Sequence, residues 1–149
     1  MRFLGAGHVI VMAIKIGIVV AEFNDEITLK MLDAALEKAR ELGMEVFQIS
    51  KVPGVFDMPL IVDALLAKKE VDAVVTLGAV IKGDTKHDEL IANSTANAIA
   101  MIAVKRAKPV ALGITGPGMT HSQAEQRIIP SAQRAVEAAK KMVEEMQRI

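Results

Sequence analysis

The sequence predicts an α/β fold. It is a single three-layer α/β/α domain of the doubly wound type, with a mainly parallel four-stranded sheet at its centre. Apolar, β-branched runs alternate with segments of helical periodicity, and short turn-prone loops separate them. Strands that alternate with helices give a parallel sheet with helices on both faces. The 149 residues suit a single domain, and no linker or repeat divides them. We therefore treat 1–149 as one domain, with 1–11 as an N-terminal arm.

Four segments have the length and composition of buried strands. They are 15–22, 44–52, 71–80 and 109–115. Gly116-Pro117-Gly118 reads as a loop after the last of them.

Helical periodicity fills the spaces between these strands. Asn24 or Asp25 caps a first helix that ends at Leu42-Gly43, and Met58-Pro59 begins a short second one. The remaining helices are predicted over 86–107, 120–128 and 130–148. The first helix is expected to bury Leu29, Leu32, Leu36 and Ala39, and the last to place Ala135, Ala139, Met142 and Met146 on one face.

Composition excludes several classes of function. Lys+Arg and Asp+Glu are both 18, so no basic excess favours nucleic acid, and with no Trp or Tyr and four Phe a stacking platform for bases is not expected. Cys is absent, which removes disulfides and thiolate chemistry and fits a reducing cytoplasm. The apolar stretch 3–21 is interrupted by His8 and Lys15, so we expect no membrane span.

In doubly wound sheets, ligands bind beyond the carboxyl ends of the strands. The loops at those ends are 22–24, 53–57, 79–87 and 113–120. We therefore expect all four to converge on one crevice.

The segment Gly83-Asp84-Thr85 precedes the long helix and has two interpretations. Asp84 or Thr85 is a helix N-cap, or the backbone N–H groups and the Thr85 hydroxyl bind a phosphate. His87 follows in the first turn, where the dipole disfavours imidazolium and a phosphate favours it. It is either a surface residue or a general acid–base. A metal cluster with Asp88 and Glu89 is a weaker alternative, because the spacing matches no metal motif.

Other crevice residues are also ambiguous. Arg127 is either a solvated helix residue or a phosphate ligand. Phe23 either packs in the core or stacks on a flat heterocycle. Phe56 is expected to pack in the core, and Asp57 is a candidate N-cap for the following helix. No G-x-G-x-x-G follows the first strand, and no P-loop or nucleophile elbow is present, which disfavours dinucleotides and NTPs.

Three motifs together resemble the lumazine synthase family, in particular its archaeal branch. They are Glu22-Phe23-Asn24, Val52-Pro-Gly-Val-Phe-Asp-Met-Pro59 and Gly78-Ala-Val-Ile-Lys-Gly-Asp-Thr-Lys-His87. The resemblance runs from about residue 14 to Arg127. It implies a flavodoxin-like fold and a transferase of riboflavin biosynthesis, which condenses 5-amino-6-(D-ribitylamino)uracil with 3,4-dihydroxy-2-butanone 4-phosphate and needs neither cofactor nor metal.

The resemblance also implies roles for single residues. His87 would transfer protons, and Asp84, Thr85 and Arg127 would hold the phosphate. The uracil and its ribityl chain would contact Phe23, Val55, Phe56, Asp57, Ala79, Val80, Ile81 and, from a neighbouring subunit, Leu112. A Phe is usual at Leu112, and an Arg is common at Glu22. The segment after Arg127 lacks the usual lysines, and Arg134 is a candidate replacement.

Assembly is implied as well. The family forms homopentamers with active sites between subunits, often built into icosahedral shells of sixty, and riboflavin synthase is a further partner. An N-terminal strand at Val9-Ile-Val would join a neighbour's sheet. The alternatives are an archaeal-type riboflavin synthase paralogue, whose substrate carries no phosphate, and a non-catalytic shell or ligand-binding protein on the same fold.

Overall fold

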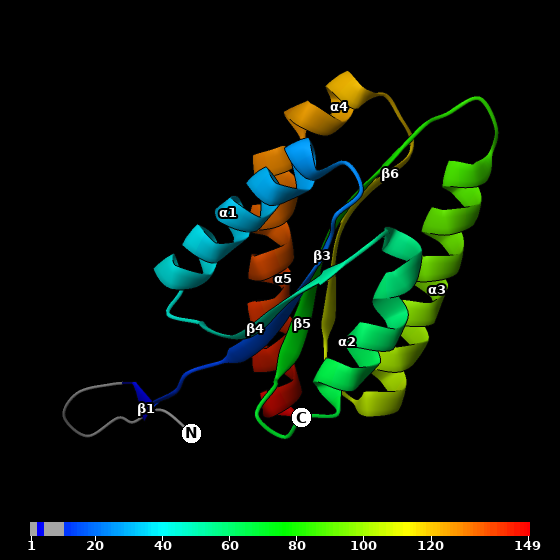
Figure 1. Cartoon of the computed structure of the whole chain (residues 1–149). Coiled ribbons are helices and arrows are strands. Elements are labelled where there is room, and N and C mark those ends of the chain that lie inside the picture. Colours follow the sequence, from blue (N-terminus) through cyan, green and yellow to red (C-terminus); the bar gives the residue numbers. More distant parts are fainter. Residues whose placement is uncertain (1–2, 5–10) are drawn as a thin grey trace.

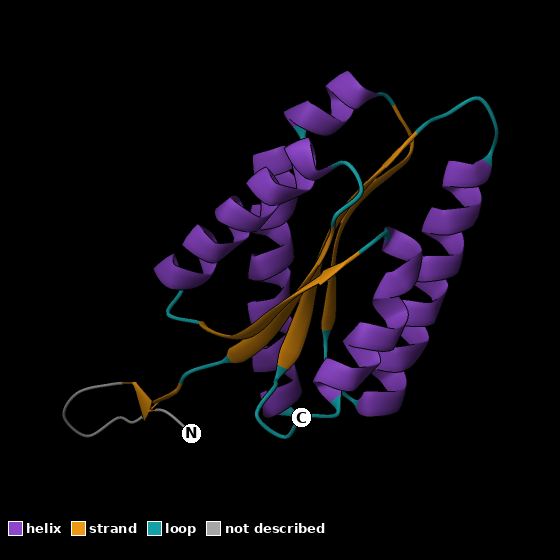
Figure 2. Cartoon of the chain, in the orientation of Figure 1, coloured by secondary structure: helices purple, strands orange, loops and turns teal. Residues whose placement is uncertain are grey.

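The computed structural model describes residues 3–4 and 11–149, and its main body is a sheet between two layers of helices (Figures 1 and 2). The strands are β1 (Phe3–Leu4), β2 (Val11–Met12), β3 (Lys15–Ala21), β4 (Glu45–Val52), β5 (Ala73–Ile81) and β6 (Val110–Met119). The helices are α1 (Asp25–Glu41), α2 (Met58–Leu66), α3 (His87–Arg106), α4 (His121–Gln126) and α5 (Ile128–Arg148), with a 3₁₀ turn at Val55–Asp57. The predicted fold class is confirmed.

The central sheet has the order β4-β3-β5-β6, and all three pairings are parallel. Its strands are apolar on both faces where helices cover both sides, and eight of the nine residues of β5 are buried. The carboxyl ends of the four strands therefore meet at one edge of the sheet.

Two apolar cores lie on the two faces of this sheet. α1, α4 and α5 cover one face, where Ile16, Ile18 and Val20 of β3 point into the larger core. α2 and α3 cover the other face, which receives Val19 and Ala21 from the same strand. The alternation along β3 is the two-residue period of a strand that contacts helices on both sides.

The apolar stripes predicted for α1 and α5 are only partly buried. In α1, Leu29 is 42% exposed, and Met31 and Ala35 are buried in its place. In α5, Met142 and Met146 are 49% and 43% exposed. The buried face of α5 is Ile128, Ala132, Ala135, Val136, Ala139 and Val143.

The end of β6 also differs from the prediction. Gly116-Pro117-Gly118 is part of the strand, which continues to Met119 rather than ending at Thr115. The register of β5 and β6 shifts between Ala79 and Ile81, and the N–H of Lys82 donates to the carbonyl of Met119 at 2.7 Å. The turn-forming residues 116–118 can belong to a strand here because β6 pairs with β5 again, at Met119, after the register shift.

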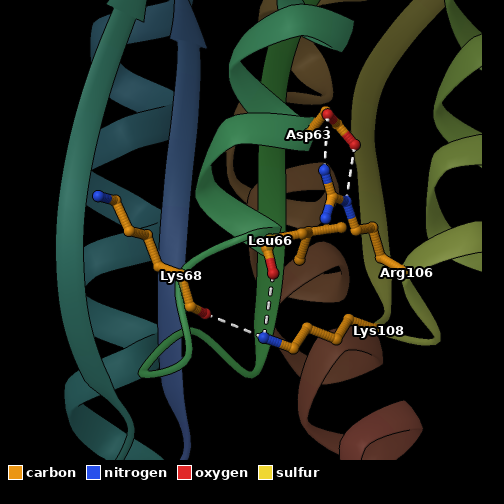
Figure 3. Close-up of polar contacts among 5 residues, drawn as sticks. All are labelled: Asp63, Leu66, Lys68, Arg106 and Lys108. Atoms are coloured by element: carbon orange, nitrogen blue, oxygen red, sulfur yellow. Dashed lines mark hydrogen bonds and ion pairs between the residues drawn. The ribbon is translucent and has the colours of Figure 1, made fainter.

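Polar contacts join α2 and α3 at the amino-terminal edge of the sheet (Figure 3). The Arg106 guanidinium donates to both carboxylate oxygens of Asp63, at 2.9 and 3.0 Å. This hydrogen bond lowers the pKa of Asp63. The ammonium of Lys108 donates to the carbonyls of Leu66 and Lys68, each at 3.0 Å, and so caps the last turn of α2.

His121 joins the N-termini of α4 and α1 on the surface. Its Nε2 lies 3.1 Å from Oε1 of Glu26, and its Nδ1 lies 2.7 Å from Oε1 of Glu125. The hydrogen bond to Glu26, with the charge of Glu125, raises the pKa of His121. Since the folded-state pKa is raised, the stabilisation is complete below the ordinary value of about 6.5 and disappears as pH rises through the folded-state pKa.

We therefore expect the wild type to be more stable than a His121→Gln variant below pH 6.5, and we expect this difference in stability to disappear as the pH rises. The measurement is the Tm of both proteins across pH 5.5–8.5 at one ionic strength, with Lys140→Gln as a control for a half-buried helix cation that pairs with Glu144. Parallel Tm curves for wild type and His121→Gln would show that the two carboxylates do not favour the imidazolium.

The N-terminal prediction falls mostly outside the described residues. Val9 and Ile10 are not described, while β1 and β2 pair with each other as an antiparallel ribbon. Addition of an N-terminal strand to a neighbour's sheet stays a prediction. Among the described helices, none has the length and apolarity needed to cross a membrane.

Candidate active site

A cavity of about 310 Å³ opens at the carboxyl-terminal edge of the sheet, within the size range of small-molecule sites. The ends of β3, β4 and β5 and the first turn of α3 surround it. Its lining is Ala21, Phe23, Asn24, Gly54, Val55, Phe56, Ala79, Val80, Ile81, Gly83, Thr85, His87, Asp88 and Ile91. Three of the four predicted loops therefore converge here.

The β3 end contributes an aromatic side chain and a structural amide. Phe23 is 73% exposed at the cavity, so it is not a core residue. Asn24 occupies the N-cap position of α1 with φ 64°, a left-handed conformation that Asn tolerates. Its side chain does not cap the helix as predicted, but donates to the carbonyl of Ala79 at 3.0 Å. That bond connects the ends of β3 and β5.

The β4 end contributes the segment 55–57. Val55 is buried, whereas Phe56 is 63% exposed beside the cavity, against the expectation that it packs. Asp57 stands at the N-cap position of α2, but its carboxylate accepts the N–H of Gly54 at 3.0 Å. Asp57 is outside the cavity lining of the chain. Two exposed aromatic rings at one opening present faces on which a flat ring can stack.

The β5 end contributes polar groups. Ala79 and Val80 are buried and line the cavity, and Thr85 and His87 follow on the same wall. α3 begins one residue later than predicted, with Lys86 at its N-cap position and no side-chain cap there. The hydroxyl of Thr85 accepts the N–H of His87 at 3.3 Å.

Backbone donors remain free beside this wall. Within the described part of the chain, no group accepts a hydrogen bond from the N–H of Gly83, Asp84 or Thr85. Asp84 is exposed and outside the cavity lining, so its carboxylate need not face an anion there. Free N–H groups at the start of a long helix favour a bound anion.

The fourth predicted loop does not reach this cavity. The residues 115–119 at the end of β6 line a second hollow of about 430 Å³, together with Gln123, Arg127, Ser131 and Arg134. The Arg127 guanidinium donates to the carbonyl of Gln123 at 3.1 Å. Leu112, which is 50% exposed, lines an adjoining hollow that shares Thr115, Ser131 and Arg134. We call these joined hollows the arginine trough.

Sequence reasoning assigned no site role to several lining residues, of which Asn24 and Asp88 are the most informative. Asn tolerates the left-handed conformation, so an Asn in the short turn between a strand and a helix is a usable signal for Asn24. The sequence offers Asp88 only as a weak metal ligand. Its carboxylate is in fact buried and accepts the N–H of Gly118 at 2.8 Å. No cluster of three or more metal-ligating side chains occurs among the residues that the structure describes.

The chain is a three-layer α/β domain whose cavity contains aromatic rings, free N–H groups and one histidine. This is the architecture of an enzyme that acts on a small molecule. The chain belongs to the 6,7-dimethyl-8-ribityllumazine synthase family, whose model matches residues 13–149. This confirms the resemblance expected from the three motifs.

Curated relatives agree over most of the chain. The 6,7-dimethyl-8-ribityllumazine synthase of Saccharolobus solfataricus is 56% identical over 137 residues, which are 92% of this chain and 89% of the relative. That of Metallosphaera sedula is 54% identical over 134 residues, covering 90% and 89%. That of Pyrobaculum arsenaticum is 54% identical over 129 residues, covering 87% and 86%.

Proposed function

We propose that this chain catalyses a step of riboflavin biosynthesis, the formation of 6,7-dimethyl-8-ribityllumazine from 5-amino-6-(D-ribitylamino)uracil and 3,4-dihydroxy-2-butanone 4-phosphate. Family membership supports this reaction. The structural observation that carries the proposal is that one cavity brings together Phe23, Phe56, Thr85 and His87 from three separate family motifs. The condensation joins an amine to a ketone, expels phosphate, closes a ring and loses water.

Each wall of the cavity suits one part of this chemistry. The exposed rings of Phe23 and Phe56 would hold the uracil, with Val55 and residues 79–81 around its polar edge and ribityl chain. A contact from Asp57, which lies outside the cavity lining, rests on the family resemblance alone. The free N–H groups of the 83–85 segment and the Thr85 hydroxyl would bind the phosphate. Holding two substrates in contact lowers the barrier by removing the entropy of their encounter. The proton transfers then require only modest general acid–base catalysis, which is the role that we assign to His87.

The position of the arginine trough supports an active site shared between copies. Leu112 and Arg127 are absent from the cavity of their own chain and lie on the trough. We propose a homopentamer in which the trough of one subunit closes the cavity of the next, so that Arg127 reaches the phosphate and Leu112 the uracil. We also propose cytoplasmic location, icosahedral assembly of pentamers and contact with riboflavin synthase, all as the family resemblance implies.

Mixing the two substrates with the purified protein tests the proposed reaction. Lumazine absorbance and fluorescence should rise with release of inorganic phosphate. Supplying lumazine alone tests the riboflavin synthase alternative, which would produce riboflavin without phosphate release. A folded, assembled protein with no turnover in either assay would favour a binding or scaffold role.

Replacing His87 by alanine should lower kcat by roughly tenfold or more, because proton transfer by a placed side chain is lost while both substrates still bind. The measurement is kcat at saturating concentrations of both substrates. His121→Gln is the matched control, since that exposed histidine lies in α4 outside the cavity lining. An unchanged kcat for His87→Ala would remove His87 from the mechanism.

A further inference from the structure

The Asp88 carboxylate lies between the cavity and the arginine trough. Asp88 stands in the first turn of α3 and is 7% exposed, whereas its neighbours His87 and Glu89 are exposed. It lines the cavity, and its Oδ2 accepts the N–H of Gly118 at 2.8 Å. Gly118 in turn lines the trough. One carboxylate therefore lines the cavity of its own chain and also contacts the wall of the trough that this chain would offer to a neighbour.

This contact has a physical basis. A buried carboxylate is costly unless hydrogen bonds compensate its lost hydration. The backbone N–H of Gly118 supplies a charge-assisted hydrogen bond, and the N-terminus of α3 adds a favourable dipole. These two terms hold the carboxylate in one place, and they hold Gly118 against α3.

Gly118 belongs to an irregular part of β6. Its φ is 74°, and the register of β5 and β6 shifts beside it. The neighbouring Met119 is attached to the loop before α3 through the N–H of Lys82, at 2.7 Å. Asp88 is therefore a second attachment, made by a side chain, between the wall of the trough and the element that carries Thr85 and His87.

We propose that Asp88 is a positioning residue, which holds the Gly118 wall of the arginine trough in register with the N-terminus of α3. The inference rests on the proposed function, in which the trough supplies the phosphate-binding Arg127. Within one subunit, Asp88 then fixes the geometry between its own cavity and the trough that it offers to a neighbour. Its effect should fall on binding of the phosphate substrate and not on proton transfer.

Steady-state kinetics of three variants test this role. Asp88→Ala should raise KM for the butanone phosphate about tenfold, and should change kcat and the uracil KM by less than about threefold, since a positioning hydrogen bond is lost. Asp88→Asn keeps an acceptor oxygen for Gly118 and should stay within about twofold of wild type. Glu89→Ala is the matched control for losing a carboxylate from the same helix turn and should leave KM unchanged.

Hydrogen exchange of the Gly118 amide gives a readout that is independent of activity. Exchange should accelerate about tenfold or more in Asp88→Ala, and remain slow in Asp88→Asn and Glu89→Ala. If Asp88→Ala does not fold, Asp88→Glu, which moves the oxygen by one methylene, should show the same two changes at smaller size.

Several results would overturn the proposal. Unchanged Gly118 exchange in Asp88→Ala would do so, as would a fall in kcat that Asp88→Asn shares, or a KM increase that Glu89→Ala shares. Failure of the wild type to make lumazine would reject the proposed function, while the exchange data would still decide whether Asp88 holds Gly118.

Discussion

Replacing Gly116 by alanine is expected to lower the free energy of unfolding by about 3 kcal/mol or more. Gly116 has φ 100°, a conformation that side chains rarely adopt. A Cβ at this position would overlap the carbonyl oxygen of Val80, which is backbone of the neighbouring strand and cannot rotate away. Backbone strain and overlap therefore add, and β5 and β6 must separate beside the cavity.

The measurement is urea unfolding followed by circular dichroism, at one protein concentration because association changes apparent stability. Gly83→Ala is the control, since its Cβ would meet no atom within 4 Å and its φ is not positive. That variant should stay within about 0.5 kcal/mol of wild type. Equal midpoints for Gly116→Ala and Gly83→Ala would show that the β6 end adapts without cost.

Replacing Arg127 by alanine is expected to raise KM for the butanone phosphate about a hundredfold, because a charged, bidentate partner of the phosphate is lost. KM for the uracil should change by less than about threefold. Arg148→Gln is the control, since it removes an exposed guanidinium from the far end of α5, where Arg148 pairs with Glu145. Equal increases in both KM values would reject the phosphate role.

A mixing experiment then decides where Arg127 acts. His87→Ala and Arg127→Ala subunits, unfolded and refolded together at equal amounts, should recover activity in about a quarter of the sites, those that take His87 from one copy and Arg127 from the next. Each variant refolded alone should remain impaired. No recovery in mixed oligomers would place both residues in one subunit's site.

The sequence is sufficient for the layers of the fold and for most of the cavity. β-branched runs and helical periodicity are local signals, so they predict β3, β4 and β5 within about two residues of their bounds. Because parallel strands end at one edge of the sheet, the order of elements along the chain is enough to assign the loops after those three strands to a common site.

The errors occur where long-range packing overrides a local signal. The Gly116-Pro117-Gly118 sequence reads as a turn, but pairing with β5 resumes after a register shift and extends β6 to Met119. In α5, the smaller Ala132 and Val136 face the sheet, and Met142 and Met146 are left partly exposed. Apolarity alone does not determine which face of a helix packs against the sheet, because close packing also depends on the size of the side chains.

The sequence by itself determined that this chain is a doubly wound α/β enzyme of the lumazine synthase family with His87 and Thr85 at the start of a long helix. Only the tertiary structure decided that Arg127, like Leu112, for which the resemblance already implied it, lies outside that cavity, and that Asp88 connects the two surfaces through Gly118. The reason is that periodicity in the sequence indicates only which face of a helix or strand is apolar. The distance between Asp88 and Gly118, which are 30 positions apart, depends on how α3 and β6 pack against each other.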